Sequence, residues 1–304
     1  MEEIYCFAGN PLDRASERRR DGEWIRSLLD DPAARILPLF DLRPATLGSD
    51  SPMLDWQPLE PWRDKVERGA TLVFLGLDEG RPHFTIDGGA AEGERERFDA
   101  RTLAPLLPSG EAAILAEARS LIDWHARHRF CAQCGSPTRV VAAGWVRRCP
   151  ECKASHYPRS DPVTIMLVVN GERALLGRNR RRPGNRFSCL AGFMEPGETL
   201  EEGVRREVHE EAGIRVGRVR YLACQPWPFP SSLMMGFLCE ALTEEITVDP
   251  EELAEARWFS REEIRAMVAR AATGPDDPSQ VSLPGPVAIA HHICRRWSHE
   301  LDGI

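Results

Sequence analysis

The sequence contains no apolar run that approaches the ~20 residues of a membrane-spanning helix. Its beginning, MEEIYCFAGN, lacks the basic region and the apolar core of a secretory signal, and its end, LDGI, is not a peroxisomal tripeptide. No internal repeat and no long low-complexity tract is present. We therefore expect a cytoplasmic protein with no membrane partner.

Positive charge is also in deficit, because the formal net charge is −8. The overall charge gives no general reason to expect binding to nucleic acid or to a membrane surface. With 304 residues, 42% of them hydrophobic and 28% charged, the chain is long enough for more than one globular domain. Five of the nine cysteines are scattered singletons, which suits a reducing compartment better than a disulfide scaffold: Cys6, Cys189, Cys224, Cys239 and Cys294.

Three glutamates are crowded in one short stretch. Glu207, Glu210 and Glu211 occupy positions i, i+3 and i+4, so at about 100° per residue they share one face of a predicted helix. Like charges at this spacing repel each other, and folding alone does not require them. The face is either a solvated acidic surface or a site where a hard divalent cation offsets the repulsion.

The predicted helix has clear ends. Thr199, followed three residues later by Glu202, makes a capping box, and Gly213 stands where a left-handed residue would end the helix. The preceding loop, GFMEPG at residues 192–197, holds two glycines and a proline, so it can close around a ligand at the helix N-terminus. Loop, helix and glutamates together predict a site for phosphate and metal.

The spacing of these residues resembles the complete Nudix box. No position departs from the pattern, which runs Gly192, Glu198, Arg206-Glu207-Val208, Glu210-Glu211 and Gly213-Ile214. The resemblance implies an α+β fold with a Nudix α/β/α sandwich around a mixed sheet. It also implies that the three glutamates bind Mg²⁺ or Mn²⁺, and that Arg206 and Glu198 hold the box together.

Cys131, Cys134, Cys149 and Cys152 form two CxxC pairs separated by fourteen residues. Four thiolates complete a tetrahedral zinc shell and leave no position for water, so we expect a structural Zn²⁺ site in a zinc ribbon. Residues 129–159 also carry six basic residues and one acidic residue. We interpret this basic segment as a solvated face or a contact with the acidic remainder of the chain; contact with nucleic acid is the alternative.

Three domains are predicted: an N-terminal α/β domain at residues 1–128, the four-cysteine zinc ribbon at 129–160, and a Nudix hydrolase domain at 161–304. The first contains no recognisable catalytic constellation. Hydrophobic patterning predicts strands at residues 35–40, 70–77, 82–86, 163–169, 174–177, 187–191, 216–222, 233–240 and 258–259. It predicts helices from the N-cap Ser109 to Arg129, at residues 261–271 and at about 286–299, in addition to the helix of the box.

A second motif, QPWPFPSS at residues 225–232, packs three prolines around two aromatic residues. Such a rigid loop can present flat surfaces to a purine or nicotinamide ring, although composition alone equally allows a hydrophobic loop packed on the core. The motif is similar to the signature of the NADH pyrophosphatase branch of the Nudix hydrolases. The order of N-terminal domain, ribbon, box and loop resembles that branch over nearly the whole chain. Cys224 departs from it, since the branch usually has serine there.

The resemblance implies hydrolysis of NADH or NAD to (reduced) nicotinamide mononucleotide and AMP, removal of the NAD cap from RNA in bacterial members, and a homodimer. Glu252 matches a further acidic residue needed for catalysis and metal binding, and Glu255 is a second candidate. Phe193 and Tyr157 match the aromatics that sandwich the nicotinamide, with Tyr157 supplied by the partner subunit. The loop adds the other substrate-binding candidates: Gln225, Trp227, Phe229 and Ser232.

The alternative function is a nucleic-acid-binding regulator that uses the basic ribbon and keeps the Nudix fold as a sensor. The complete set of carboxylates argues against it, because a sensor has no need of all of them.

Overall fold

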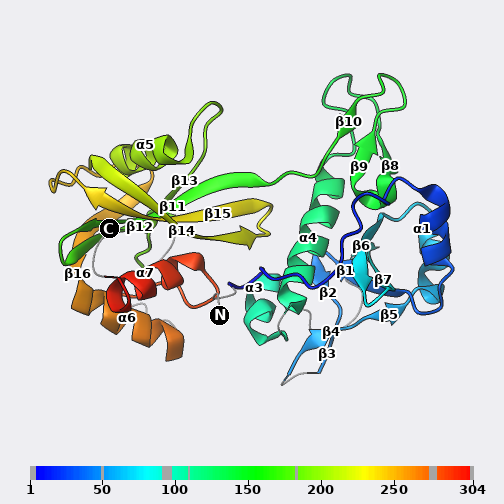
Figure 1. Cartoon of the computed structure of the whole chain (residues 1–304), viewed down its shortest axis with the longest axis horizontal. Coiled ribbons are helices and arrows are strands. Elements are labelled where there is room, and N and C mark those ends of the chain that lie inside the picture. The colour runs from blue at the N-terminus through cyan, green and yellow to red at the C-terminus, as the bar shows by residue number, and fades with distance from the viewer. Residues whose placement is uncertain are drawn as a thin grey trace. The chain divides into compact units, whose positions relative to one another are not determined.

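The computed structural model describes residues 5–48, 51–90, 98–108, 110–181, 184–273 and 279–301. The chain forms two compact units (Figure 1). Unit 1 comprises Met1–Ser160 together with Pro226–Ser231, and unit 2 comprises Asp161–Gln225 and Ser232–Ile304. Within the described ranges, no helix combines the length and apolarity needed to cross a membrane.

Unit 1 is built on a mixed sheet. Strand β1 (Arg35–Phe40) pairs in parallel with β7 (Arg81–Gly89), which pairs antiparallel with β6 (Leu72–Asp78). Two short strands, β2 (Arg43–Pro44) and β5 (Gln57–Pro58), pair with β1. The predicted first strand and the predicted hairpin are therefore confirmed.

Helices cover both faces of this sheet. Successive residues of a strand point to opposite faces, so neighbouring residues of β1 pack against different helices. Leu37 packs in one hydrophobic cluster with Leu115 of α4, while its neighbour Ile36 packs in another with Leu28 of α1. The predicted helix is confirmed as α4, and its predicted N-cap Ser109 lies outside the described residues. The other elements of this region are α1 (Gly22–Leu29), β3 (Thr46–Leu47), β4 (Met53–Leu54), η1 (Glu60–Trp62), α2 (Arg63–Glu67), α3 (Ala100–Leu103), η2 (Ala104–Leu106) and α4 (Glu111–Arg127).

The zinc ribbon region is a small three-stranded sheet that follows α4. Its strands are β8 (Arg139–Val141), β9 (Val146–Arg148) and β10 (Ser155–His156), which pair antiparallel in the order β10-β9-β8. The turn η3 (Ala142–Gly144) joins β8 to β9. All three residues of β8 are exposed, so this sheet has little core of its own. A domain of this size commonly depends on a metal for its fold.

Unit 2 contains a six-stranded mixed sheet. Its order is β14-β15-β11-β12-β16, with β13 also paired to β11; β11 and β15 run parallel, and β12 and β13 run antiparallel to β11. The strands are β11 (Asp161–Asn170), β12 (Arg173–Asn179), β13 (Leu190–Phe193), β14 (Val216–Trp227), β15 (Ser232–Ala241) and β16 (Leu253–Ser260). The predicted strand at 187–191 begins only at Leu190, because Phe187 and Ser188 are hydrogen-bonded to Ser282 and Gly177 instead of to β11.

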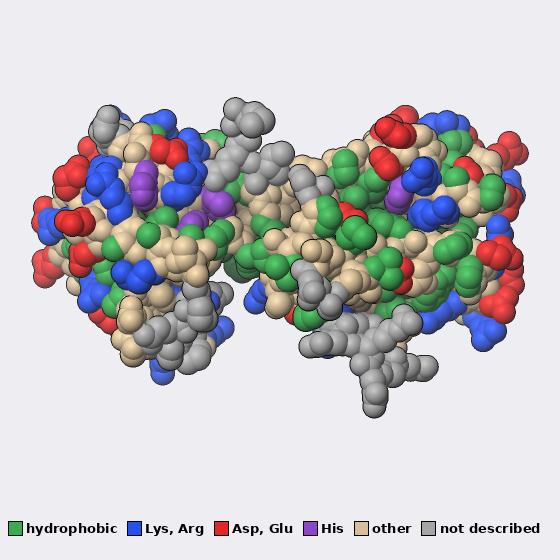
Figure 2. Space-filling model, turned by 90° about the horizontal axis from the view of Figure 1, so that it is seen from below, with side chains coloured by type: hydrophobic (Ala, Val, Ile, Leu, Met, Phe, Trp, Pro, Cys, Tyr) green, Lys and Arg blue, Asp and Glu red, His purple; other side chains and the backbone are tan. Residues whose placement is uncertain are grey.

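Helix α5 (Leu200–Ala212) covers one face of this sheet, and α6 (Arg261–Thr273) and α7 (Ile289–His299) cover the other (Figure 1). The α/β/α sandwich around a mixed sheet is thus confirmed. The predicted ends of α5 are also confirmed, since Thr199 and Glu202 form a capping box and Gly213 is left-handed with φ of +70°. On the face of unit 2 seen in Figure 2, basic and acidic side chains are interspersed.

Candidate functional site

The box helix and the strand before it meet at a glycine. A Cβ atom at Gly192 would lie 1.8 Å from the carboxyl carbon of Glu207, so only glycine allows β13 to approach α5 this closely. Thr164 of β11 donates a hydrogen bond to the carbonyl of Gly192 at 3.4 Å and ties this point to the central strand. The Glu207 carboxyl is therefore held directly against the end of the sheet.

Three of the predicted carboxylates converge beside this point. Glu207 and Glu211 come from successive turns of α5, and Glu252 comes from the turn just before β16. One oxygen from each of them lies within 4.8 Å of the other two. Carboxylate oxygens gathered in this way are the donors that hard divalent cations take, so the three residues fit such an ion.

Glu211 has the least compensated charge of the three. It is 5% exposed, and its Oε2 atom has no hydrogen-bond partner within the described residues. Burial, reinforced by Glu207 and Glu252, raises the pKa of Glu211 to about 8. Burial also raises the pKa of Glu207. A carboxylate that stays ionised in these surroundings needs a cation, and among the described residues the groups that shift the Glu211 pKa are acids.

Arg206 cross-links the remainder of the box. Its guanidinium donates to both carboxylate oxygens of Glu198, to Glu207 at 2.8 Å, to Glu210 at 2.9 Å and to the carbonyl of Phe193 at 2.9 Å. The hydrogen bond from Arg206 is the main cause that lowers the pKa of Glu198 to about 2. These bonds agree with a structural role for both residues. Glu210 is half-exposed and faces Arg206, and its role as a metal ligand remains a prediction.

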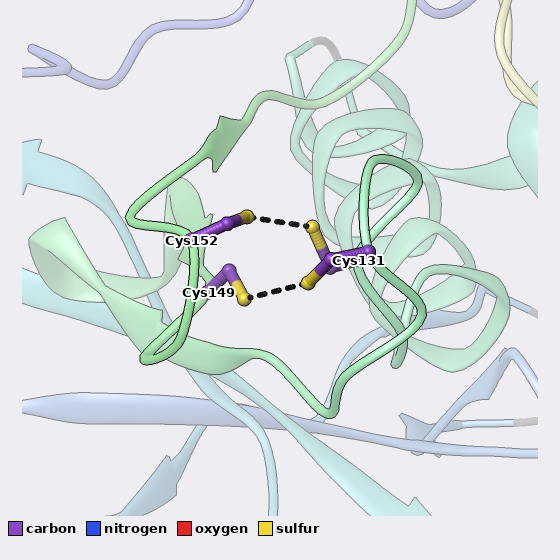
Figure 3. Close-up of side chains that lie close together, drawn as sticks. Cys131, Cys149 and Cys152 are labelled. Atoms are coloured by element: carbon purple, nitrogen blue, oxygen red, sulfur yellow. Dashed lines mark hydrogen bonds between the residues drawn. The ribbon is translucent and has the colours of Figure 1, made fainter.

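The four clustered cysteines form a second group of donors. Their Sγ atoms all lie within 4.8 Å of one another, with 3.5 Å between Cys131 and Cys152 and between Cys134 and Cys149 (Figure 3). A tetrahedral zinc shell with metal–sulfur bonds of about 2.3 Å separates its sulfurs by about 3.8 Å, so the arrangement fits one ion. Hydrogen bonds from the backbone and hydroxyl of Ser136 lower the pKa of Cys134 to about 6, which favours the thiolate.

A buried network joins the ribbon to α4 within unit 1. Arg147 of β9 donates to Nδ1 of His125 at 3.0 Å and to the hydroxyl and carbonyl of Thr138. Since that ring nitrogen must accept, the opposite nitrogen carries the proton and donates to the carbonyl of Gly144 at 2.7 Å. Burial lowers the pKa of His125 to about 4, so the ring is neutral. His125 is thus a structural histidine that joins α4 to the ribbon.

The two aromatics predicted to hold the nicotinamide are both open to a ligand. Phe193, at the end of β13, is 60% exposed, and Tyr157, directly after β10, is 58% exposed. Phe130 and Tyr221 are exposed to a similar extent, so exposure leaves Phe193 and Tyr157 accessible without distinguishing them, and their contact with the nicotinamide remains a prediction. Ser232 begins β15 opposite Asp161 of β11, which gives the hydroxyl a fixed backbone position.

Gln225 is fully buried. Its side-chain amide donates to the carbonyl of Val287 and accepts from the amide of Ile289, each at 2.8 Å. The side chain therefore fixes the start of α7, and contact between Gln225 and substrate remains a prediction.

Trp227 and Phe229 belong to the part of the loop that is grouped with unit 1. Both rings meet Phe7 edge to face, and two arginines from the N-terminal region, Arg101 and Arg119, lie over Phe229. Sequence patterning missed Phe7 and these arginines, because their partners are more than a hundred residues away. Contact of Trp227 and Phe229 with substrate remains a prediction.

Three family models match the chain in series. They are described as the NADH pyrophosphatase-like rudimentary NUDIX domain at residues 33–124, the NADH pyrophosphatase zinc ribbon domain at residues 126–157 and the NUDIX domain at residues 159–279.

The chain is also similar to individual proteins along most of its length. The NAD-capped RNA hydrolase NUDT12 of Homo sapiens is 36% identical over 341 residues, covering 96% of this chain and 72% of that protein. The NAD-capped RNA hydrolase NudC of Mycobacterium bovis (strain BCG / Pasteur 1173P2) is 40% identical over 236 residues, covering 74% of this chain and 75% of that protein. A crystal structure of a NUDIX hydrolase from Nitrosomonas europaea is 26% identical, covers 57% of this chain and 91% of its own, and has a TM-score of 0.45.

Proposed function

We propose that this chain, which belongs to the NADH pyrophosphatase branch of the Nudix hydrolases, cleaves the diphosphate of NADH and NAD. The products are (reduced) nicotinamide mononucleotide and AMP, and the same bond is the one cleaved when an NAD cap is removed from RNA. Water attacks one phosphorus, the bridging P–O bond breaks, and each half leaves as a monophosphate.

Glu207, Glu211 and Glu252 would hold the divalent cations, Mg²⁺ or Mn²⁺, with Glu210 as a fourth carboxylate. Bound cations of this kind neutralise the diphosphate oxygens and lower the pKa of the attacking water. The chain contributes the positions of these groups: Arg206 fixes the carboxylates of Glu207 and Glu210, and Gly192 lets Glu207 reach the end of the sheet. Glu210 and Glu252 are the candidates for the group that accepts the proton from the attacking water.

One observation carries this proposal. Glu211 is buried beside Glu207 and Glu252, and one of its oxygens has no hydrogen-bond partner in the described part of the chain. Crowded, buried carboxylates destabilise a fold unless a cation joins them. A chain that merely sensed a nucleotide would gain stability from a neutral residue at this position, so the crowding supports metal-assisted hydrolysis.

Phe193 and Tyr157 are proposed to stack on the nicotinamide, with Tyr157 reaching the site of the partner subunit in a homodimer. Zn²⁺ on the four cysteines would support this position, since Tyr157 follows His156, whose ring nitrogen lies 3.3 Å from Cys131 Sγ. Ser232 is proposed as a polar contact to substrate. We also propose that the chain is divided into three domains, 1–128, 129–160 and 161–304, and that the protein is cytoplasmic.

Product analysis tests the function directly. The protein is incubated with NADH, ADP-ribose and NAD-capped RNA at equal concentrations, with Mg²⁺ or Mn²⁺, and the nucleotides are separated. We expect AMP and reduced nicotinamide mononucleotide from NADH with the wild type and none with Glu211→Gln. Equal turnover by the two proteins would refute the assignment of Glu211 to the metal site. Cleavage of ADP-ribose alone would refute NADH as the substrate.

A further inference from the structure

The segment Pro226–Ser231, here called the 226–231 loop, comprises the last two residues of β14 and the turn that leads into β15, and it has an unexpected place in the fold. The chain leaves unit 2 after Gln225, contributes these residues to unit 1, and returns to unit 2 at Ser232. The loop therefore packs with the N-terminal part of the sequence although it joins two neighbouring strands of the Nudix sheet, β14 and β15.

Three aromatic rings pack at the centre of this arrangement. Trp227 and Phe229 lie 5.3 Å apart between ring centroids, and Phe7 meets them at 5.8 Å and 5.9 Å, all edge to face. Phe7 is 2% exposed and has a left-handed backbone with φ of +68°, a conformation that a bulky residue adopts only where its surroundings hold it. Phe229 also packs against the core of unit 1.

Two guanidinium groups complete the enclosure of Phe229. That of Arg101 lies 4.1 Å from the ring centroid and that of Arg119, on α4, lies 4.6 Å from it. Arg119 also donates a hydrogen bond to the carbonyl of Pro228, and the neighbouring Ser120 donates one to the carbonyl of Pro230 at 3.4 Å. Arg119 thus holds the loop through both a ring and a backbone carbonyl.

Both ends of the loop are fixed as well. The Gln225 amide is bonded to Val287 and Ile289, and Ser232 enters β15 in register with Asp161. A short segment fixed at its tip and at both ends has little conformational freedom to lose when substrate binds, so loss of the contacts at the tip would loosen the residues that lead into Ser232.

We infer that Arg119 is a positioning residue, which together with Arg101 anchors the 226–231 loop to the N-terminal domain and thereby sets Ser232 for substrate. This rests on the proposed function. The rings of Trp227 and Phe229 act as the anchor, since their contacts are already taken by Phe7 and the arginines. The N-terminal domain, which has no catalytic constellation of its own, gains a role in substrate affinity.

A double-mutant cycle tests the anchor. The variants are Arg119→Met, Phe229→Leu and the two combined, with Arg119→Lys as the conservative variant. The control is Arg26→Met, at an exposed arginine of α1 whose side chain makes no hydrogen bond or ion pair within the described residues. Steady-state kinetics with NADH and the midpoint of thermal unfolding are measured for each protein.

We expect each single change to raise KM for NADH about tenfold while kcat stays within about twofold, because uniform binding is lost and the carboxylate site is untouched. The double variant should raise KM by less than the product of the two single effects, since both single changes break the contact between Arg119 and the Phe229 ring. Arg119→Lys keeps a cation and a donor and should recover most of the affinity, and Arg26→Met should behave as wild type.

Additive effects on KM would overturn the inference, because a Phe229 ring stacked directly on substrate would lose its contribution whether or not Arg119 is present. Wild-type KM in Arg119→Met would overturn it too. The midpoints of thermal unfolding can be measured without substrate. If the effects of the Arg119 and Phe229 changes on the midpoint are coupled but the protein does not cleave NADH, the proposed function is refuted and the anchoring role of Arg119 stands. Uncoupled midpoints would refute the anchor itself.

Discussion

Helices α4 and α5 occupy similar places in their two units. Each covers one face of a mixed sheet, and each carries a deeply buried glutamate: Glu117 is 8% exposed on α4, and Glu211 is 5% exposed on α5. Each carboxylate has one oxygen without a hydrogen-bond partner among the residues described. Burial raises both pKa values, to about 7 for Glu117 and about 8 for Glu211.

The neighbours of the two glutamates have opposite charges. Glu117 accepts a hydrogen bond from Asn10, lies 3.7 Å from Arg14, and has the guanidinium of Arg19 as a further cation nearby. Glu211 faces other acids instead. Burial of a carboxylate therefore does not mark a functional site in this protein. The sign of the surrounding charge does, because only the glutamate of α5 requires a cation from solution.

The strongest test of this difference removes the charge from each helix in turn. Glu211→Gln should lower kcat/KM for NADH at least about 1,000-fold, about 4 kcal/mol of transition-state stabilisation, because a cation ligand is lost. Glu117→Gln should stay within about threefold of wild type, since its carboxylate is offset by the chain's own arginines. Equal losses in both variants, measured by steady-state kinetics, would remove the distinction between the helices.

The four cysteines of the ribbon would form a closed metal site, in contrast to the open group of carboxylates on α5. Cys149→Ser should release zinc and destabilise the protein by several kcal/mol, roughly the effect of losing a structural metal, while turnover per folded molecule is retained at first. Metal analysis and thermal unfolding measure both effects. Cys224→Ser, at an exposed cysteine outside the cluster, is the matched control and should keep its zinc. A zinc-free wild-type protein would contradict the prediction.

The pH dependence of stability should reveal the contribution of Glu117 on α4. The folded-state pKa of Glu117, about 7, exceeds its usual value, so the native state binds the proton more tightly. Its contribution to the free energy of unfolding is therefore present below about pH 4.5 and is lost as pH rises through 7, by up to about 3 kcal/mol. Denaturant unfolding of wild type and Glu117→Gln across this range should show a shallower slope in the variant, because Glu211, whose pKa is also raised, still contributes there.

His125 provides the opposite slope in the same unit. Its folded-state pKa of about 4 lies below its usual value, so its contribution is present above about pH 6.5 and is lost as pH falls towards 4. His125→Gln keeps a donor and an acceptor for Gly144 and Arg147 and should flatten that acidic limb. Two variants that changed the profile in the same direction would show that the charge assignments are wrong.

The smallest expected effect is the change in the free energy of unfolding when a divalent cation binds in the absence of substrate. Mg²⁺ or Mn²⁺ at ten times its dissociation constant should stabilise the wild type by about 1.4 kcal/mol, because the ion binds only the folded carboxylates. Glu117→Gln should respond equally and Glu211→Gln should not respond. Thermal unfolding with and without the ion measures the shift, and a response in Glu211→Gln would place the cation elsewhere.

Local chemistry explains which features were predictable from sequence. The ends of α5 depend on Thr199, Glu202 and Gly213, which act within a few residues of one another, and the hairpin of β6 and β7 depends on a short turn. The four cysteines are equally local. These features were anticipated correctly because their physical causes lie inside the segments that display them.

Other features depend on residues that the fold brings together from far apart. Glu252 enters the carboxylate group from a turn forty residues beyond α5, and only the family resemblance pointed to it. The partners of Glu117 lie a hundred residues before it. Aromatic composition equally allowed the rings of Trp227 and Phe229 to face a ligand or the core, and their contacts with Phe7 and Arg119 arise only after folding.

Because the 226–231 loop packs with unit 1, the chain cannot be cut at Ser160 into two fragments that each keep their own contacts. A fragment beginning at Asp161 would keep the whole Nudix sheet, yet it would carry Trp227 and Phe229 without Phe7, Arg101 or Arg119 to cover them. An exposed aromatic pair of this kind invites self-association.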